Sequence, residues 1–272
     1  MTGKIVKTAW VFDADGVIVD LSEKKTESKI LDFIAGRLKL EEPVAFNTGR
    51  SVAWMIDQVI NPLLARIKDK RILRRLFVSG EKGGAWFTIN TDGSKNIQID
   101  ESLRISDSLH EKIQNFIAET SPEALGEYEK KLTMISFEMT TGFSYEKFKI
   151  IQKKLTQEIN ELVKRTGLRD DLRVDPTRAA IDIENQRVGK GFAMGIILQW
   201  MKEMELTPQK IITFGDSKSD FEMAQKAYKK GFQTEFVYVG GDTTFKNIKT
   251  EIPIIIPKSK FEKGTLEFLQ TL

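Results

Sequence analysis

The chain has 272 residues, of which 40% are hydrophobic and 30% charged, so it is long enough for one large or two modest domains but not apolar enough to live in a bilayer. Its formal net charge of +3 is too small to indicate a nucleic acid or an anionic membrane as partner. It contains no cysteine and one histidine, His110, which excludes disulfides, thiolate nucleophiles and Cys/His zinc sites. A functional site in this chain would therefore rely on carboxylates, lysine and backbone groups.

The N-terminal residues 1–7 lack the apolar core of a signal peptide, and the longest apolar runs are far below the roughly 20 residues that span a bilayer. The basic stretch at residues 65–75 has apolar residues at helical spacing and no aromatic residues between its charges, so we interpret it as the solvated face of a helix. We therefore expect a cytoplasmic protein, a monomer or homodimer, with neither nucleic acid nor membrane as partner.

Short apolar runs alternate with amphipathic stretches along the chain, a pattern typical of a parallel sheet with crossover helices. The predicted strands are 8–12, 44–46, 76–79, 211–214, 235–239 and 253–256, and the predicted helices are 24–40, 52–67, 191–204, 221–229 and 261–269. Between residues 89 and 184 the pattern changes to helices at 103–117 and 145–163 with strands at 132–139, 172–174 and 180–183. The sequence predicts a doubly wound α/β domain, residues 1–87 and 186–272, with an α+β domain inserted at 88–185.

Two aspartates follow the first predicted strand. Asp13 and Asp15 leave its carboxyl end, where open α/β sheets bind their ligands. One residue separates them, so their side chains start on the same side of the chain, and a turn at Gly16 directs both at one substrate. One ionised carboxylate would attack phosphorus while its neighbour, partly protonated beside a like charge, protonates the leaving oxygen. Taken alone, the pattern also fits a polar exit from a strand.

Two other sites are excluded at this loop. Val17 and Ile18 occupy positions where an EF-hand needs Asp or Asn and then Gly. The glycine pattern of a dinucleotide site does not follow the strand.

The second predicted strand ends in Asn47-Thr48-Gly49-Arg50-Ser51, just before a helix. Thr48 offers a hydroxyl, and Gly49 an unobstructed backbone N–H, to a phosphate at the start of that helix. Ordinary N-capping by Thr48 or Ser51 is the alternative.

Lys190 stands where the predicted helix 191–204 begins. A lysine there opposes the helix macrodipole, at a cost of roughly 0.3–1 kcal/mol. An ammonium group between an attacking carboxylate and a substrate phosphate would offset this cost, and solvent exposure is the alternative. A Walker P-loop is excluded, because it would need Gly at Glu184 and Ser or Thr at Gly191.

Asp216 and Asp220 follow the predicted strand 211–214, after Gly215. If the next helix begins near Ser217, both carboxylates face the same cleft. Hard carboxylate oxygens without His or Cys beside them suit Mg²⁺. Helix capping and compensation of the macrodipole are the alternatives.

In this order the four motifs resemble those of the haloacid dehalogenase superfamily of phosphohydrolases: an Asp-x-Asp loop, a Ser/Thr, a Lys and an acidic Gly-Asp-x-x-x-Asp loop. The resemblance spans the whole chain and implies a Rossmann-like core with an inserted cap and Mg²⁺ as cofactor. It implies the following roles: Asp13 as nucleophile, Asp15 as general acid/base, Thr48, Gly49 and Lys190 as phosphate binders, and Asp13, the backbone carbonyl of Asp15, Asp216 and Asp220 in the metal site. Val17 departs from the Thr of many family phosphatases.

The long interval between Thr48 and Lys190 leaves room for the cap after the third predicted strand. This arrangement resembles the class-two cap group, which includes sugar phosphatases, sucrose-phosphate and mannosyl-phosphoglycerate phosphatases, and eukaryotic-type phosphomannomutase. In that group the segment before the lysine approaches the substrate, which implies contacts from Arg178, Asn185, Gln186 and Arg187.

The expected activity is Mg²⁺-dependent hydrolysis of a small phosphate ester, such as a sugar phosphate, through an aspartyl-phosphate. Two alternatives stay open: a phosphomutase that uses the same intermediate, and a non-catalytic regulatory binding protein.

Overall fold

The computed structural model describes residues 4–20, 25–120, 123–125, 127–140, 142–167, 171–177, 180–245 and 248–272. The chain divides into two compact units: unit 1 comprises Met1–Gln98 and Gly189–Leu272, and unit 2 comprises Ile99–Val188. These limits differ from the predicted ones, which place the inserted domain at residues 88–185. Strands at 85–89 and 95–99 extend the sheet of unit 1, and Arg187 hydrogen-bonds to Ser102, which keeps residues 186–188 with unit 2.

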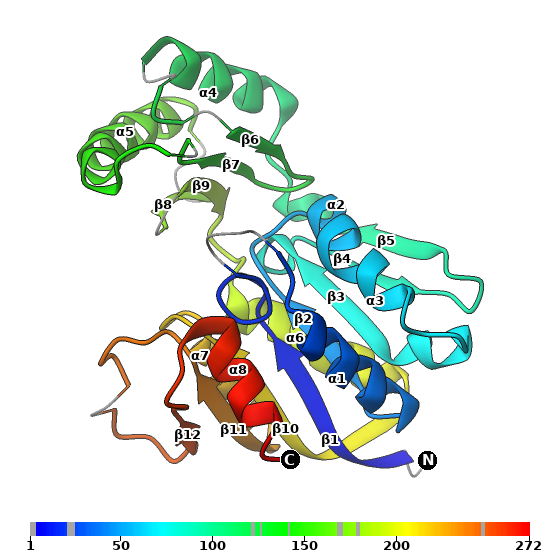
Figure 1. Ribbon diagram of the computed structural model, residues 1–272. Helices are drawn as coiled ribbons and strands as arrows, with labels where there is room; N and C mark the ends of the chain where they lie inside the picture. Colours follow the sequence, from blue (N-terminus) through cyan, green and yellow to red (C-terminus); the bar gives the residue numbers. More distant parts are fainter. Residues whose placement is uncertain are drawn as a thin grey trace. The chain divides into compact units, whose positions relative to one another are not determined.

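Unit 1 is built on a sheet whose described strands run in the order β12-β11-β10-β1-β2-β3-β4-β5 (Figure 1). Neighbouring strands from β12 to β3 are parallel, and β4 is antiparallel to β3. The predicted doubly wound α/β fold is thereby confirmed. The strands are β1 (Lys4–Phe12), β2 (Val44–Asn47), β3 (Leu76–Gly80), β4 (Ala85–Ile89), β5 (Lys95–Ile99), β10 (Leu206–Gly215), β11 (Gln233–Tyr238) and β12 (Ile254–Ile255).

Both faces of this sheet are covered, which explains why its central strands are continuous apolar runs. Side chains alternate along β1: Ala9 and Val11 join the apolar cluster formed with α6 and α7, whereas Phe12 stacks on Phe214 with ring centroids 4.4 Å apart. Phe268 of α8 packs edge-on against Phe214. The helices are α1 (Ser28–Lys39), α2 (Val52–Met55), α3 (Asn61–Leu64), α6 (Lys190–Glu203), α7 (Phe221–Lys229) and α8 (Phe261–Leu269).

Three adjacent parallel strands deliver polar loops to one edge of the sheet. Phe12 at the end of β1 is in register with Phe46 of β2 and with Phe214 of β10. Parallel neighbours end at the same edge, so the residues that follow β1, β2 and β10 emerge side by side.

Two predicted helical stretches of unit 1 take a different form in the structure. The helix predicted at 52–67 consists of α2, a π-helical turn at Ile56–Ile60 and α3. The basic stretch contains a 3₁₀ helix at Lys70–Arg75, and Arg75 is only 4% exposed, with its guanidinium 3.6 Å from Glu41. The solvated-face interpretation is therefore wrong for Arg75, whose long side chain turns inward.

Unit 2 is a small α+β structure. Its described strands form an antiparallel sheet in the order β6-β7-β9-β8, and apolar side chains of α4 and α5 pack with those of β7 and β9 in one core. No helix in the described ranges is both long and apolar enough to cross a membrane. The elements are α4 (Asp107–Thr120), β6 (Glu127–Lys130), β7 (Ile135–Glu138), α5 (Tyr145–Arg165), β8 (Leu172–Pro176) and β9 (Ala180–Asn185).

Candidate active site

The centre of the site is the ammonium group of Lys190, at the first residue of α6. Its Nζ lies 2.6 Å from Oδ1 of Asp13 and 2.8 Å from Oδ1 of Asp220, and it donates a hydrogen bond to the carbonyl oxygen of Asn47 at 2.8 Å. The amide of Asn47 donates in return to the carbonyl oxygen of Lys190 at 2.9 Å. The side chain is buried, so these oxygens, rather than solvent, offset the unfavourable position of a lysine at a helix N-terminus.

Asp220 organises the loop after β10. Its Oδ2 accepts hydrogen bonds from the backbone N–H of Asp216 at 3.2 Å and of Ser217 at 3.0 Å, and from the Ser217 hydroxyl at 2.6 Å. A Cβ at Gly215 would lie 2.1 Å from the Cβ of Asp220, so only glycine fits at that position. The loop thus holds Asp216 at the end of β10 while Asp220 faces Lys190.

Asp13, Asp216 and Asp220 form an acidic cluster in which one carboxylate oxygen from each lies within 4.8 Å of the others; Asp13 and Asp220 are buried and Asp216 is partly buried. Burial, reinforced by the neighbouring carboxylates, raises the pKa of Asp13 to about 7 and that of Asp216 to about 8, although Lys190 counteracts this rise. Burial alone would lower the pKa of Lys190, but Asp13 and Asp220 raise it above its usual value. Lys190 therefore stays charged while Asp13 and Asp216 are poised to titrate.

The cluster has the donor set of a site for a hard divalent cation. Within the described part of the chain, no hydrogen-bond donor engages the Asp216 carboxylate, and its Oδ2 lies so close to Gly16 that a Cβ there would be 2.7 Å away. The acidic groups at this edge also outnumber the bases, since Asp13, Asp15, Asp216 and Asp220 face Lys190 and Arg50. Mg²⁺ prefers such oxygens and would balance the excess charge.

Asp15 meets Arg50 rather than Lys190. The guanidinium donates from Nε to Oδ2 at 2.8 Å and from Nη2 to Oδ1 at 3.0 Å, and its central carbon lies 4.8 Å from the ring centroid of Trp54. Arg50 directly follows Thr48 and Gly49, but no role for it was predicted from the sequence. No periodicity reveals a pairing between residues in the loops that follow two different strands.

The loop after β2 is tied to the turn before α6. Thr48 accepts the backbone N–H of Lys82 at 2.9 Å, and the carbonyl of Lys82 accepts the N–H of Gly189 at 2.9 Å. Lys82 has a positive φ of 54°, and its side chain runs beside Gly49. The capping alternative is correct for Ser51, whose hydroxyl accepts the N–H of Trp54 at 3.1 Å. Sequence reasoning missed Lys82, since its importance lies in backbone bonds.

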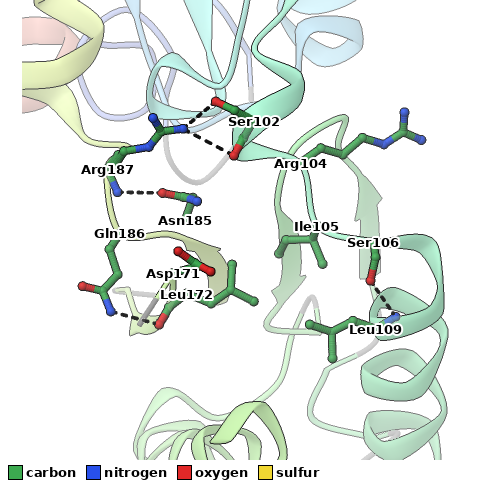
Figure 2. Close-up of a pocket in the computed structure, with 10 residues that line it drawn as sticks. All are labelled: Ser102, Arg104, Ile105, Ser106, Leu109, Asp171, Leu172, Asn185, Gln186 and Arg187. Carbon is green, nitrogen blue, oxygen red and sulfur yellow. Dashed lines mark hydrogen bonds between the residues drawn. The ribbon is translucent and has the colours of Figure 1, made fainter. Parts of the chain in front are cut away.

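Three of the predicted substrate contacts line a cavity of about 360 Å³ within unit 2 (Figure 2). The guanidinium of Arg187 donates to the hydroxyl and carbonyl of Ser102, and the backbone N–H of Arg187 donates to Asn185. The Gln186 amide donates to the Leu172 carbonyl. These bonds give all three residues a role inside unit 2, and their contact with substrate stays a prediction. Arg178 lies outside the described residues.

The model of one protein family, the haloacid dehalogenase-like hydrolases, matches residues 63–231. No curated protein sequence matches the chain. Among solved structures, the C-terminal domain of C. albicans trehalose-6-phosphate phosphatase is similar, with a TM-score of 0.67 and 18% identity over 97% of this chain and 92% of that one. Thermoplasma acidophilum 0175 is also similar, with a TM-score of 0.59 and 14% identity over 98% of both chains.

Plasmodium falciparum IMP-nucleotidase has a TM-score of 0.53 and 13% identity over 79% of this chain and 55% of that one. Because the sequence identities to these three structures are all below 20%, the similarities show a common fold.

The raised pKa of Asp216 predicts how its replacement changes stability with pH in metal-free solution. A carboxyl with a raised folded-state pKa contributes stability that is present below its unfolded pKa of 3.8 and is lost as the pH rises through about 8. Asp216→Asn removes this loss of folding stability with rising pH. The melting temperature of the variant, measured in EDTA, should therefore gain on that of the wild type between about pH 5 and about pH 9.

Asp242→Asn is the matched control. Hydrogen bonds from Thr244 and Tyr238 lower the pKa of Asp242, so this carboxyl stays ionised throughout and its replacement should shift the melting temperature equally at each pH. A difference between Asp216→Asn and wild type that does not change with pH would contradict the assignment.

Proposed function

This chain belongs to the haloacid dehalogenase-like hydrolases, and we propose that it is a Mg²⁺-dependent phosphatase that hydrolyses a small phosphorylated metabolite through an aspartyl-phosphate. The four motifs predicted that the chain belongs to this family, and the family match confirms it. The observation that carries the proposal is the meeting of Asp13, Lys190 and Asp220 at one edge of the sheet, beside Asp216.

In this proposal Asp13 attacks phosphorus, and its carboxylate forms the new P–O bond as the bond to the leaving oxygen breaks. Lys190 stays protonated and partly neutralises the charge on the phosphoryl oxygens, supported by the Thr48 hydroxyl and the Gly49 N–H. Asp15 donates a proton to the leaving oxygen and then removes one from the water that hydrolyses the acyl phosphate. Free Asp13 and inorganic phosphate result.

The metal would be held by Asp13, Asp216 and the backbone carbonyl of Asp15. Asp220 commits Oδ2 to its loop, and its Oδ1 lies 2.8 Å from Nζ of Lys190, so a direct bond from Asp220 to the metal stays a prediction. When bound, Mg²⁺ supplies charge neutralisation at the phosphoryl group.

A sugar phosphate is the proposed substrate class. Support comes from two trehalose-6-phosphate phosphatases, of C. albicans and Aspergillus fumigatus, which share this fold over 97% of the chain. Unit 2 occupies the position in the chain of the predicted cap, and in this proposal Asn185, Gln186 and Arg187 contribute to recognition of the group that carries the phosphate.

A substrate panel tests the activity. Sugar phosphates, phosphoglycerates and nucleotides are incubated with the protein in Mg²⁺ or in EDTA, and free phosphate is measured. We expect release from at least one sugar phosphate in Mg²⁺ and none in EDTA. An absence of turnover on every ester would favour the non-catalytic binding protein, and isomerisation with a bisphosphorylated activator would favour the phosphomutase.

Asp13→Asn should lower kcat at least about a thousandfold, as is usual when a catalytic nucleophile is removed. The variant should still fold, because Lys190 keeps its contacts with Asp220 and Asn47. Asp242→Asn serves as a control that retains activity, and circular dichroism checks the fold of both. If the folded Asp13→Asn variant retains turnover, the proposed aspartyl-phosphate mechanism is wrong.

Added Mg²⁺ should raise the melting temperature of the wild type, because the cation binds the folded acidic cluster and not the unfolded chain. The rise should disappear in Asp216→Asn and persist in Asp242→Asn. An equal rise in all three proteins would place the cation elsewhere.

A further inference from the structure

The contact between Arg50 and Asp15 has the geometry of a fork. Two parallel hydrogen bonds, from Nε and Nη2, reach the two oxygens of one carboxylate at 2.8 Å and 3.0 Å. Such a bidentate pair fixes the plane of the carboxylate as well as its position. The side chain of Asp15 is 34% exposed and that of Arg50 only 15%. The guanidinium is therefore largely buried, and the carboxylate is the more solvent-accessible partner.

Arg50 is itself held in place from several directions. Its backbone N–H donates to the Thr48 hydroxyl at 3.2 Å, and its carbonyl accepts the N–H of Glu81 at 3.0 Å. The guanidinium lies over the ring of Trp54, in the first turn of α2. Rotamers locked in this way preorganise the group that they support.

The loop that carries Asp15 does not fix its side chain in the same way. The carbonyl of Ala14 accepts the N–H groups of Val17, Ile18 and Val19, which fastens the backbone of the turn. Among the described residues, the hydrogen bonds to the Asp15 carboxylate come from Arg50. The direction in which that carboxylate points is therefore set by Arg50.

We propose that Arg50 is a positioning residue that orients the Asp15 carboxylate for proton transfer to the leaving oxygen, an inference that rests on the proposed function. The rival role is direct binding of the substrate phosphoryl group by Arg50. The structure favours positioning, because two guanidinium nitrogens already engage both oxygens of Asp15. Proton transfer depends on a narrow geometry, so a misaligned Asp15 would slow esters whose leaving group needs that proton.

The test compares two aryl phosphates of similar size whose leaving groups differ in basicity: phenyl phosphate, which needs protonation, and p-nitrophenyl phosphate, which needs little. The value of kcat/KM reports the steps through phosphoenzyme formation. For Arg50→Gln we expect kcat/KM to fall by about tenfold or more on phenyl phosphate and by less than about threefold on p-nitrophenyl phosphate. Arg50→Lys should behave like Arg50→Gln, because an ammonium keeps the charge but lacks the planar fork.

Two further measurements separate positioning from binding and from a merely structural effect. In an Asp15→Asn background, Arg50→Gln should cost less than about twofold on phenyl phosphate, because a residue that acts through Asp15 has no further effect once Asp15 is lost. The inhibition constant of inorganic phosphate should be unchanged in Arg50→Gln, whereas loss of a phosphate contact would raise it.

Arg71→Gln is the matched control, since Arg71 also makes a bidentate contact, with Asp69, at an exposed position. It should retain wild-type kcat/KM on both esters. Equal losses on the two esters in folded Arg50→Gln, additive losses with Asp15→Asn, or a raised inhibition constant for phosphate would each overturn the inference. If the wild type hydrolyses neither ester nor any member of the substrate panel, the proposed function itself fails, which is a distinguishable result.

Discussion

A buried ammonium group among buried carboxylates is the interaction on which the site depends. Lys190 connects the carboxyl ends of β1, β2 and β10, through Asp13, the Asn47 carbonyl and Asp220. None of these charges would be tolerated alone in a buried position, because removing one partner leaves an unpaired charge. Burial, reinforced by the neighbouring carboxylates, raises the pKa values of Asp13 and Asp216, and the four aspartates at the site outnumber Lys190 and Arg50. That residual negative charge is what a divalent cation would neutralise.

The topology of the sheet makes this arrangement possible. β1 lies between β10 and β2, and all three are parallel, so their carboxyl ends share an edge. Apolar packing on both faces, such as the stacking of Phe12 on Phe214, opposes a shift of the strand register by even one residue. A shift of one residue would turn the acidic side chains to the opposite face. The core of unit 1 therefore sets the geometry of the polar site.

Backbone constraints complete the loops. Gly215 leaves room for Asp220, and Gly16, with a φ of 68°, leaves room for the carboxylate of Asp216. The left-handed residue Lys82 joins the Thr48 loop to the turn before Lys190. Strained backbone is costly and persists where the surroundings enforce it, and here it links two of the loops at the site.

The sequence alone determined the positions of the four motifs, the parallel α/β class and the presence of an inserted domain. These features are local: alternation along a strand places Asp13 and Asp15, and apolar runs bounded by glycine mark the strand ends. β4 and β5 were not predicted, because residues 85–89 alternate between buried and partly exposed positions and residues 95–99 are mostly exposed, unlike the continuously buried central strands.

Only the tertiary structure decided that Arg50 engages Asp15, that Lys82 bridges two loops, and that unit 2 begins at Ile99. Each of these depends on contacts between segments far apart in the chain. Such contacts are set by how strands pair and loops cross, and no local periodicity or composition records them.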